Sequence, residues 1–166
     1  MPYDMNSHLW PNLEDIFFRN QELRALSQIG PHCVSTSLAI LTGANPEDFQ
    51  GIVNTQDPIS WSEKIKEWDM QLAYCPTDAR KLRFYIPELL ELDDLFTLSY
   101  YLDEDAILED PDDDGWICGS HIVVMHRDKI IDPEGGLVIR AEEHPCNNYH
   151  TKRIFRVVPT GYYRSL

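Results

Sequence analysis

Three residues that lie far apart along this sequence have the types that nucleophilic thiol chemistry requires. The first is Cys33, which follows the turn-forming pair Gly30-Pro31 and begins a largely apolar run that favours a helix. A cysteine in the first turn of a helix has its thiolate stabilised by unpaired backbone N–H groups and by the positive end of the helix dipole. Because the thiolate is the reactive form, Cys33 is the candidate for covalent attack on a carbonyl carbon.

His121 and Asp132 are the candidates for the base and for the group that orients it. His121 begins a short apolar run and follows two small residues, which leaves its ring open to a cleft. The polar residues 126–129 separate that run from residues 130–132 and predict a tight hairpin. The turn returns Asp132 to the level of His121, where a carboxylate can fix the tautomer and the orientation of the imidazole.

Gln28 lies a few residues before Cys33, and its side-chain amide can donate an N–H to an oxygen held beside the sulfur. That is the role of an oxyanion-stabilising group. The chain order of the four candidates is glutamine, cysteine, histidine and aspartate. This pattern resembles the papain-like cysteine peptidases, and most closely the small bacterial members related to the bacteriocin-processing (double-glycine) peptidases.

The resemblance covers residues 28–43 and 119–136. It implies a thiol hydrolase in which Cys33 attacks a carbonyl, His121 acts as base and then as acid, and Asp132 orients the ring. Gln28 would stabilise the oxyanion, and no cofactor would be needed. The substrate implied is an amide bond of a protein or peptide. Peptidase, deamidase and acyltransferase activity remain open, because all three use the same acyl-enzyme.

Helices are predicted mainly in the first half of the chain. An apolar face over residues 12–26 predicts a helix, and a buried helix is expected over 34–41 with a glycine cap at Gly43. Further helices are expected to begin at three places: at Asn45, which precedes a proline, at Ser60 with Glu63 as a capping box, and at residues 77–78. The Ser60 helix is expected to run through residue 68, and Pro87 is expected to kink or end the last one.

The second half of the chain predicts strands, namely residues 95–102, 121–125, 130–132 and 152–158. Helices followed by antiparallel strands indicate an α+β fold. We therefore expect one papain-like domain over residues 1–166. Its helical N-terminal half would carry the Cys33 helix and would pack on a C-terminal antiparallel sheet, with the cleft between the two halves.

The charge of the chain limits its partners. The sequence has 14 Lys and Arg against 28 Asp and Glu, a formal net charge of −14. Such a protein is repelled by phosphate backbones and by anionic lipid, so neither nucleic acid nor a membrane is expected as a partner, whereas a basic protein or peptide would be attracted. The sequence has neither a secretory signal nor a membrane span, which predicts a cytoplasmic protein with its four cysteines reduced.

Three other interpretations were weighed. A papain-like fold without activity would act as a binding module that captures a basic partner. Zinc could be held by a cysteine–histidine set, although the paired Cys-x-x-Cys spacing of structural zinc sites is absent; that set comprises Cys118, His121, His144, Cys146 and His150. The acidic residues 103–114 include Asp110, Asp112 and Asp114, whose spacing matches the opening of a calcium-binding loop, but the last ligand position falls on His121 instead of a carboxylate. Residues 103–114 are therefore interpreted as an exposed rim that favours a basic substrate.

Overall fold

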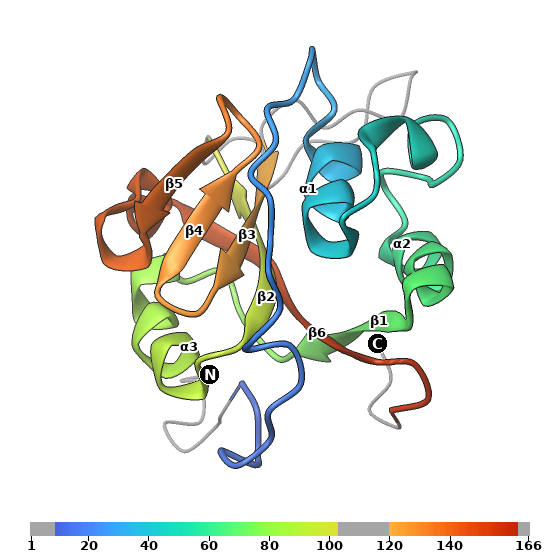
Figure 1. Ribbon diagram of the computed structural model, residues 1–166. Coiled ribbons are helices and arrows are strands. Elements are labelled where there is room, and N and C mark those ends of the chain that lie inside the picture. Colours follow the sequence, from blue (N-terminus) through green and yellow to red (C-terminus); the bar gives the residue numbers. More distant parts are fainter. Residues whose placement is uncertain (1–8, 103–119, 163–166) are drawn as a thin grey trace.

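The computed structural model describes residues 9–102 and 120–162. These residues form a mixed α and β structure around a six-stranded antiparallel sheet with the order β1-β6-β2-β3-β4-β5 (Figure 1). The strands are β1 (Met70–Cys75), β2 (Leu95–Tyr101), β3 (Ser120–His126), β4 (Lys129–Asp132), β5 (Leu137–Arg140) and β6 (His150–Pro159). The α+β class predicted from the sequence is confirmed.

Three α-helices lie in the described residues, and they are α1 (Cys33–Thr42), α2 (Pro58–Ile65) and α3 (Ile86–Leu92). Short 3-10 turns complete the helical structure, at Pro46–Asp48, Lys66–Trp68, Leu82–Phe84, Ala141–Glu143 and Pro145–Asn148. None of the helices in the described part of the chain has the length and apolar character needed to cross a membrane.

The sheet is covered on both faces, which explains the composition of its central strands. Residues of α1 and α2 share one apolar cluster with alternate residues of the sheet, and α3 belongs to a second cluster with the others. Six of the seven residues of β2 are buried as a result. A strand that is buried on both faces needs a nearly continuous apolar run rather than an alternating one.

Helix α1 ends as the sequence predicts. Residues 34–41 are all buried, and Gly43 adopts a left-handed conformation with φ 80° while its N–H donates to the carbonyl of Ala39. A glycine takes this conformation without the steric cost of a Cβ. The predicted hairpin is also present, because β3 and β4 are joined by a two-residue turn.

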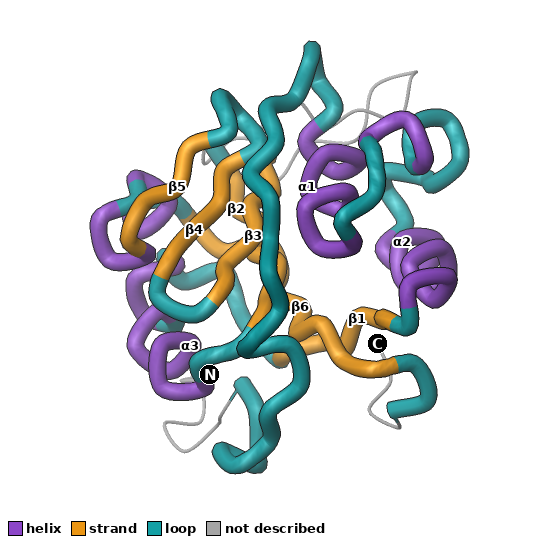
Figure 2. The backbone as a smooth tube through the Cα atoms, in the orientation of Figure 1, coloured by secondary structure: helices purple, strands orange, loops and turns teal. Residues whose placement is uncertain are grey.

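The helix predicted over residues 12–26 is wrong. The segment is an extended loop (Figure 2) whose backbone donors bind a distant carboxylate instead of the carbonyls one turn back. The N–H groups of Phe17 and Phe18 each donate to Asp94, at 2.8 Å. The apolar residues of this segment do not form one buried helical face, because Leu13 and Ile16 are exposed whereas Phe17 packs on the core.

Two further helix boundaries differ from the prediction. Helix α2 is capped by Asp57, whose side chain accepts the N–H of Ile59, and not by Ser60. Pro87 neither kinks nor ends a helix, because it lies in the first turn of α3, where its missing N–H has no helical partner to lose. The residues after 77–78 do not start an α-helix; the chain there reaches α3 through a 3-10 turn.

A buried ion pair joins the extended segment to the sheet. Arg156 of β6 donates from Nη2 to Asp94 Oδ2 at 2.6 Å, and neither side chain is exposed. Nη2 also donates to the carbonyl of Asp15 at 2.9 Å. The guanidinium lies 4.7 Å from the ring centroids of both Trp10 and Phe17, so these aromatic surfaces lie beside its Nε and Nη1, which have no hydrogen-bond acceptor among the described residues. The pair therefore holds residues 10–18 against the sheet.

We expect Asp94→Asn to lower the free energy of unfolding by about 3–5 kcal/mol, because it leaves the Arg156 charge buried without a counter-charge. Urea unfolding followed by circular dichroism measures the change. Glu67→Gln is the matched control, since it removes a carboxylate from the exposed pair with Lys64 and should cost less than ~1 kcal/mol. Equal losses in the two variants would contradict the role given to the buried pair.

Candidate active site

Cys33 is the first residue of α1, and the loop before it is tied to the end of β4. The backbone N–H of Gln28 donates to the carbonyl of Pro133 at 2.6 Å. Gly136 allows a second close approach, because a Cβ at that position would lie 3.4 Å from backbone atoms of Leu26 and Ser27. These contacts bring the N-terminus of α1 to the end of the β3–β4 hairpin.

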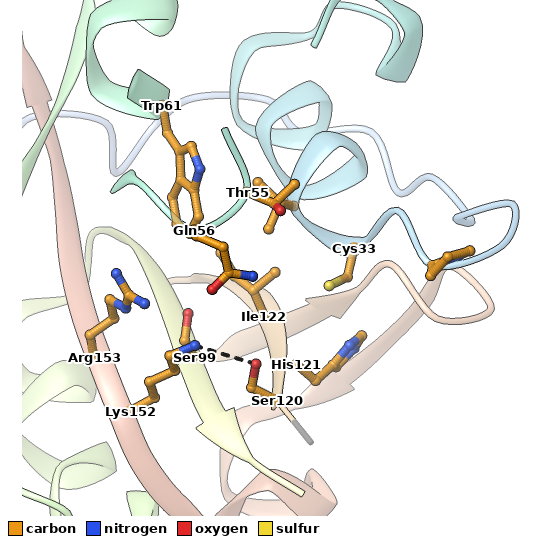
Figure 3. Close-up of a pocket in the computed structure, with 12 residues that line it drawn as sticks. Cys33, Thr55, Gln56, Trp61, Ser99, Ser120, His121, Ile122, Lys152 and Arg153 are labelled. Atoms are coloured by element: carbon orange, nitrogen blue, oxygen red, sulfur yellow. Dashed lines mark hydrogen bonds between the residues drawn. The ribbon is translucent and has the colours of Figure 1, made fainter. Parts of the chain in front are cut away.

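The hairpin presents His121 and Asp132 on one face. Val124 pairs with Ile131, so the alternation of side chains along the strands places His121 and Asp132 together on the opposite face. The ladder with β4 covers only the last residues of β3, so His121 lies where β3 has no neighbour on that side. This open end of β3 is where Cys33 arrives, and Figure 3 shows Cys33 and His121 next to each other at the pocket.

The three predicted residues Cys33, His121 and Asp132 meet at one place. His121 Nε2 lies 2.8 Å from Asp132 Oδ1, and both residues are almost fully buried. Cys33 lines the same pocket as His121, and the interaction between them contributes to the raised pKa of the ring. Because Asp132 occupies Nε2, Nδ1 is the ring nitrogen left for the sulfur. This is the arrangement of a thiol nucleophile, a base and an orienting carboxylate.

The electrostatics of the site favour a charged imidazole. Burial alone would lower the pKa of His121, but hydrogen bonds with Asp132 and Cys33 outweigh it and raise the pKa to about 9. Burial alone would raise the pKa of Asp132, but its hydrogen bonds with His121 and His144 hold the pKa of the carboxyl well below its usual range. Asp132 is therefore ionised at neutral pH.

His144 is a site residue that the sequence interpretation did not place. Its Nε2 lies 2.8 Å from Asp132 Oδ2, and its Nδ1 accepts the N–H of Cys146 at 2.9 Å. An Nδ1 that accepts a hydrogen bond leaves the proton on Nε2, so His144 donates to the carboxylate. With the N–H of Glu134 at 2.9 Å, Asp132 has three donors that fix its position.

The side chain of Gln28 does not reach the thiol in this structure. Its Nε2 donates to the carbonyl of Gly30 at 2.8 Å, within its own loop, and the residue does not line the pocket beside Cys33. Gln56 does line that pocket, and its side chain extends into it (Figure 3). The sequence around Gln56 carries no feature that would have singled it out.

The pocket beside Cys33 lies between the two halves of the fold. Helix α1, the loop before α2, and strands β2, β3 and β6 all contribute to its wall. The space within it, its open mouth included, is about 510 Å³. Its lining residues are Pro31, Cys33, Val34, Thr55, Gln56, Trp61, Ser99, Ser120, His121, Ile122, Lys152 and Arg153.

Two of the alternative interpretations, the zinc site and the acidic rim, can be compared with the structure only in part. Both ring nitrogens of His144 are engaged by protein atoms, and His150 Nδ1 lies 2.7 Å from the carbonyl of Ala79. Neither side chain converges with Cys146 as a zinc ligand set would. Cys118, the remaining member of that set, and the acidic residues 103–114 lie outside the described residues.

Comparisons with known proteins leave the site to be interpreted from its own geometry. No family model matches the chain, and neither a curated protein nor a solved structure matches it.

We expect the ring of His121 to titrate with a pKa of about 9 and Asp132→Asn to lower that value, because the variant removes the carboxylate that opposes the effect of burial. NMR titration of the histidine rings, assigned with a His121→Gln variant, measures both. Asp128→Asn is the control, since Asp128 lies in the exposed hairpin turn and contacts Lys129 rather than His121. A wild-type pKa near 6.5 would contradict the ion pair.

The raised pKa of His121 makes the stability of the folded protein depend on pH. The folded protein holds the His121 proton up to about pH 9, whereas an unfolded histidine releases it near 6.5. The contribution of His121 to the free energy of unfolding is therefore complete below pH 6.5 and is lost as the pH rises to about 9. Wild-type protein should lose stability over that interval relative to His121→Gln, as urea unfolding at a series of pH values would show.

Proposed function

We propose that this protein is a papain-like thiol hydrolase that acts on an amide bond of a protein or peptide through an acyl-enzyme. The observation that carries the proposal is the His121 ring, which has Asp132 on Nε2 and lines the same pocket as Cys33. Cys33 is also the first residue of α1, so the unpaired N–H groups of the first turn of that helix lie beside it. A Cys33 helix packed on an antiparallel sheet also fits the papain-like architecture.

The reaction that follows has two halves. The Cys33 thiolate attacks the carbonyl carbon and forms a C–S bond, and the carbonyl electrons move onto oxygen. His121 then gives its proton to the leaving nitrogen, the C–N bond breaks, and a thioester remains. In the second half, His121 takes a proton from water, which attacks the thioester, and the C–S bond breaks to release a carboxylic acid and the thiolate.

The developing oxyanion needs hydrogen-bond donors near the sulfur. The backbone N–H of Cys33 belongs to the first turn of α1 and has no partner within the helix, so it is one donor. Two side-chain amides are candidates for the second. Gln28 would have to leave Gly30, whereas Gln56 already extends into the pocket and has no hydrogen bond from its side chain to another described residue. Gln56 is therefore the better placed of the two.

We expect iodoacetamide at neutral pH to label Cys33 faster than the other described cysteines, because Cys75 and Cys146 are buried and burial raises the pKa of Cys146 to about 12. His121→Ala should slow the labelling of Cys33 on the order of 100-fold. Peptide mass spectrometry over a time course gives the rate at each cysteine.

The matched control is His32→Ala, which removes a half-buried imidazole that is next to Cys33 in the sequence but does not line the pocket. Its labelling rate should stay within about twofold of wild type, because no proton relay depends on it. If His32→Ala and His121→Ala slow the reaction equally, or if Cys33 reacts no faster than a free thiol, the proposed nucleophile is wrong.

Turnover separates a hydrolase from a binding module with the same fold. With p-nitrophenyl acetate, we expect a rapid burst of about one equivalent of p-nitrophenol, an acetyl group on Cys33 by intact mass, and then slower steady release. Cys33→Ala should abolish the burst. Gln56→Ala should lower the rate constant of the burst by about 10-fold or more, as loss of an oxyanion donor does. A labelled Cys33 with no burst and no turnover would favour the inactive binding module.

A further inference from the structure

The pocket beside Cys33 has a positive wall, although the protein as a whole is strongly acidic. Lys152 and Arg153 are consecutive residues of β6, and both line the pocket. A β-bulge lies at this point, because the pairing of β2 with β6 passes from Ser99–Arg153 to Tyr100–Thr151 and leaves Lys152 without an opposite residue. The bulge lets two successive side chains line the same pocket, where regular alternation would send one to the other face.

These two cations have no carboxylate partner among the described residues. Lys152 Nζ contacts the hydroxyl of Ser120 at 3.4 Å and lies 5.8 Å from the ring centroid of Tyr101. The guanidinium of Arg153 lies 5.8 Å from the ring centroid of Trp61. Elsewhere in the described structure, arginine and lysine side chains repeatedly pair with Asp or Glu, as Arg127 does with Asp93.

Holding both charges in this place is unfavourable without an anion. The two side chains are half-buried, and burial together with their mutual repulsion lowers the pKa of Lys152 to about 8. Burial likewise lowers the pKa of Arg153 from its ordinary value. The interaction of Lys152 with Cys33 acts in the opposite sense and places the ammonium within electrostatic reach of the sulfur. An anion in the pocket would offset the repulsion and lie next to the nucleophile.

We propose that this pocket binds a carboxylate carried by the substrate close to the attacked carbonyl, with Lys152 and Arg153 as its binding residues and Gln56 and Ser99 as neutral donors. This rests on the proposed function, since it names the class of substrate that Cys33 attacks. The substrate is then an acidic peptide, and its carboxylate belongs either to an Asp or Glu side chain or to the end of a chain. Trp61 supplies an apolar wall for the stem of such a side chain.

The net charge of −14 does not oppose this specificity. Exposed charges are screened beyond about 8 Å at physiological ionic strength, so the overall charge mainly affects the rate of encounter. Two half-buried cations in a pocket act at contact distance, where screening is weak. The basic substrate expected from the sequence rested on the overall charge and on residues 103–114. The acidic group proposed here follows from the lining of the pocket, and it replaces that expectation for the part of the substrate next to Cys33.

The test compares two maleimides that differ only by a carboxylate. N-ethylmaleimide is neutral, and 3-maleimidopropionate carries a carboxylate on the same ethyl stem. For each protein we take the Cys33 labelling rate with the anionic reagent over the rate with the neutral reagent, and divide it by the same ratio measured for N-acetylcysteine. We expect this normalised ratio to be on the order of five for the wild-type protein. Lys152→Gln and Arg153→Gln should each bring this ratio towards one.

The matched control is Lys66→Gln, which loses the same charge at an exposed position outside the pocket. Its ratio should equal that of wild type, because only local charge is at issue. A wild-type ratio at or below one, or an equal fall in Lys66→Gln and Lys152→Gln, overturns the proposal. Failure of the proposed function has a different signature, since Cys33 would then react no faster than a free thiol with either reagent and His121→Ala would change nothing.

Protection experiments identify the source of the carboxylate. Three capped tripeptides are compared as protectants of Cys33 against N-ethylmaleimide: acetyl-Ala-Glu-Ala-amide, acetyl-Ala-Gln-Ala-amide and acetyl-Ala-Gln-Ala with a free terminus. Stronger protection by the first supports a side-chain carboxylate, and stronger protection by the third supports a terminal one. Equal protection by all three contradicts anion recognition.

Discussion

The carboxylate of Asp132 is the group on which the candidate site depends. It accepts hydrogen bonds from His121, from His144 and from the backbone N–H of Glu134, so both of its oxygens are engaged. A buried charge is tolerated only when it is paired and hydrogen-bonded, and these donors meet that condition. In return, the fixed carboxylate sets which nitrogen of His121 is free to face Cys33. His144 acts through Asp132 and is a positioning residue rather than a catalytic one.

The distance in sequence between Cys33 and His121 is bridged by backbone contacts rather than by the site residues themselves. The loop before α1 is tied to the end of β4 by the bond from Gln28 N–H to Pro133, while the buried pair of Arg156 and Asp94 holds the preceding segment on the sheet. The short hairpin leaves the His121 end of β3 open for α1. Each of these contacts is made outside the pocket, so the geometry of the site is set by the fold around it.

The sequence predicted the parts of the site whose causes are local. The hairpin follows from its polar turn, and α1 follows from Gly30-Pro31 and Gly43, so Cys33, His121 and Asp132 could be placed in advance. Residues 12–26 could not, because their backbone donors go to Asp94, which lies far along the chain. The roles of His144 and Lys152 were missed for a related reason. His144 contacts Asp132, which lies on another element, and Lys152 reaches the pocket through a bulge in β6; neither feature has a recognisable local pattern.

The bulge in β6 could not be predicted from the sequence, and it determines which charged side chains line the pocket. In a regular strand, Lys152 and Arg153 would point to opposite faces, and the pocket would hold one cation beside Trp61. The register shift between Ser99 and Tyr100 of β2 brings the second cation to the wall that Cys33 shares. One cation next to a thiolate favours its ionisation, and a second cation next to the first is repelled unless an anion is bound. The charge at the pocket therefore exceeds what the proposed nucleophile alone would require, and the proposed substrate carboxylate would account for the excess.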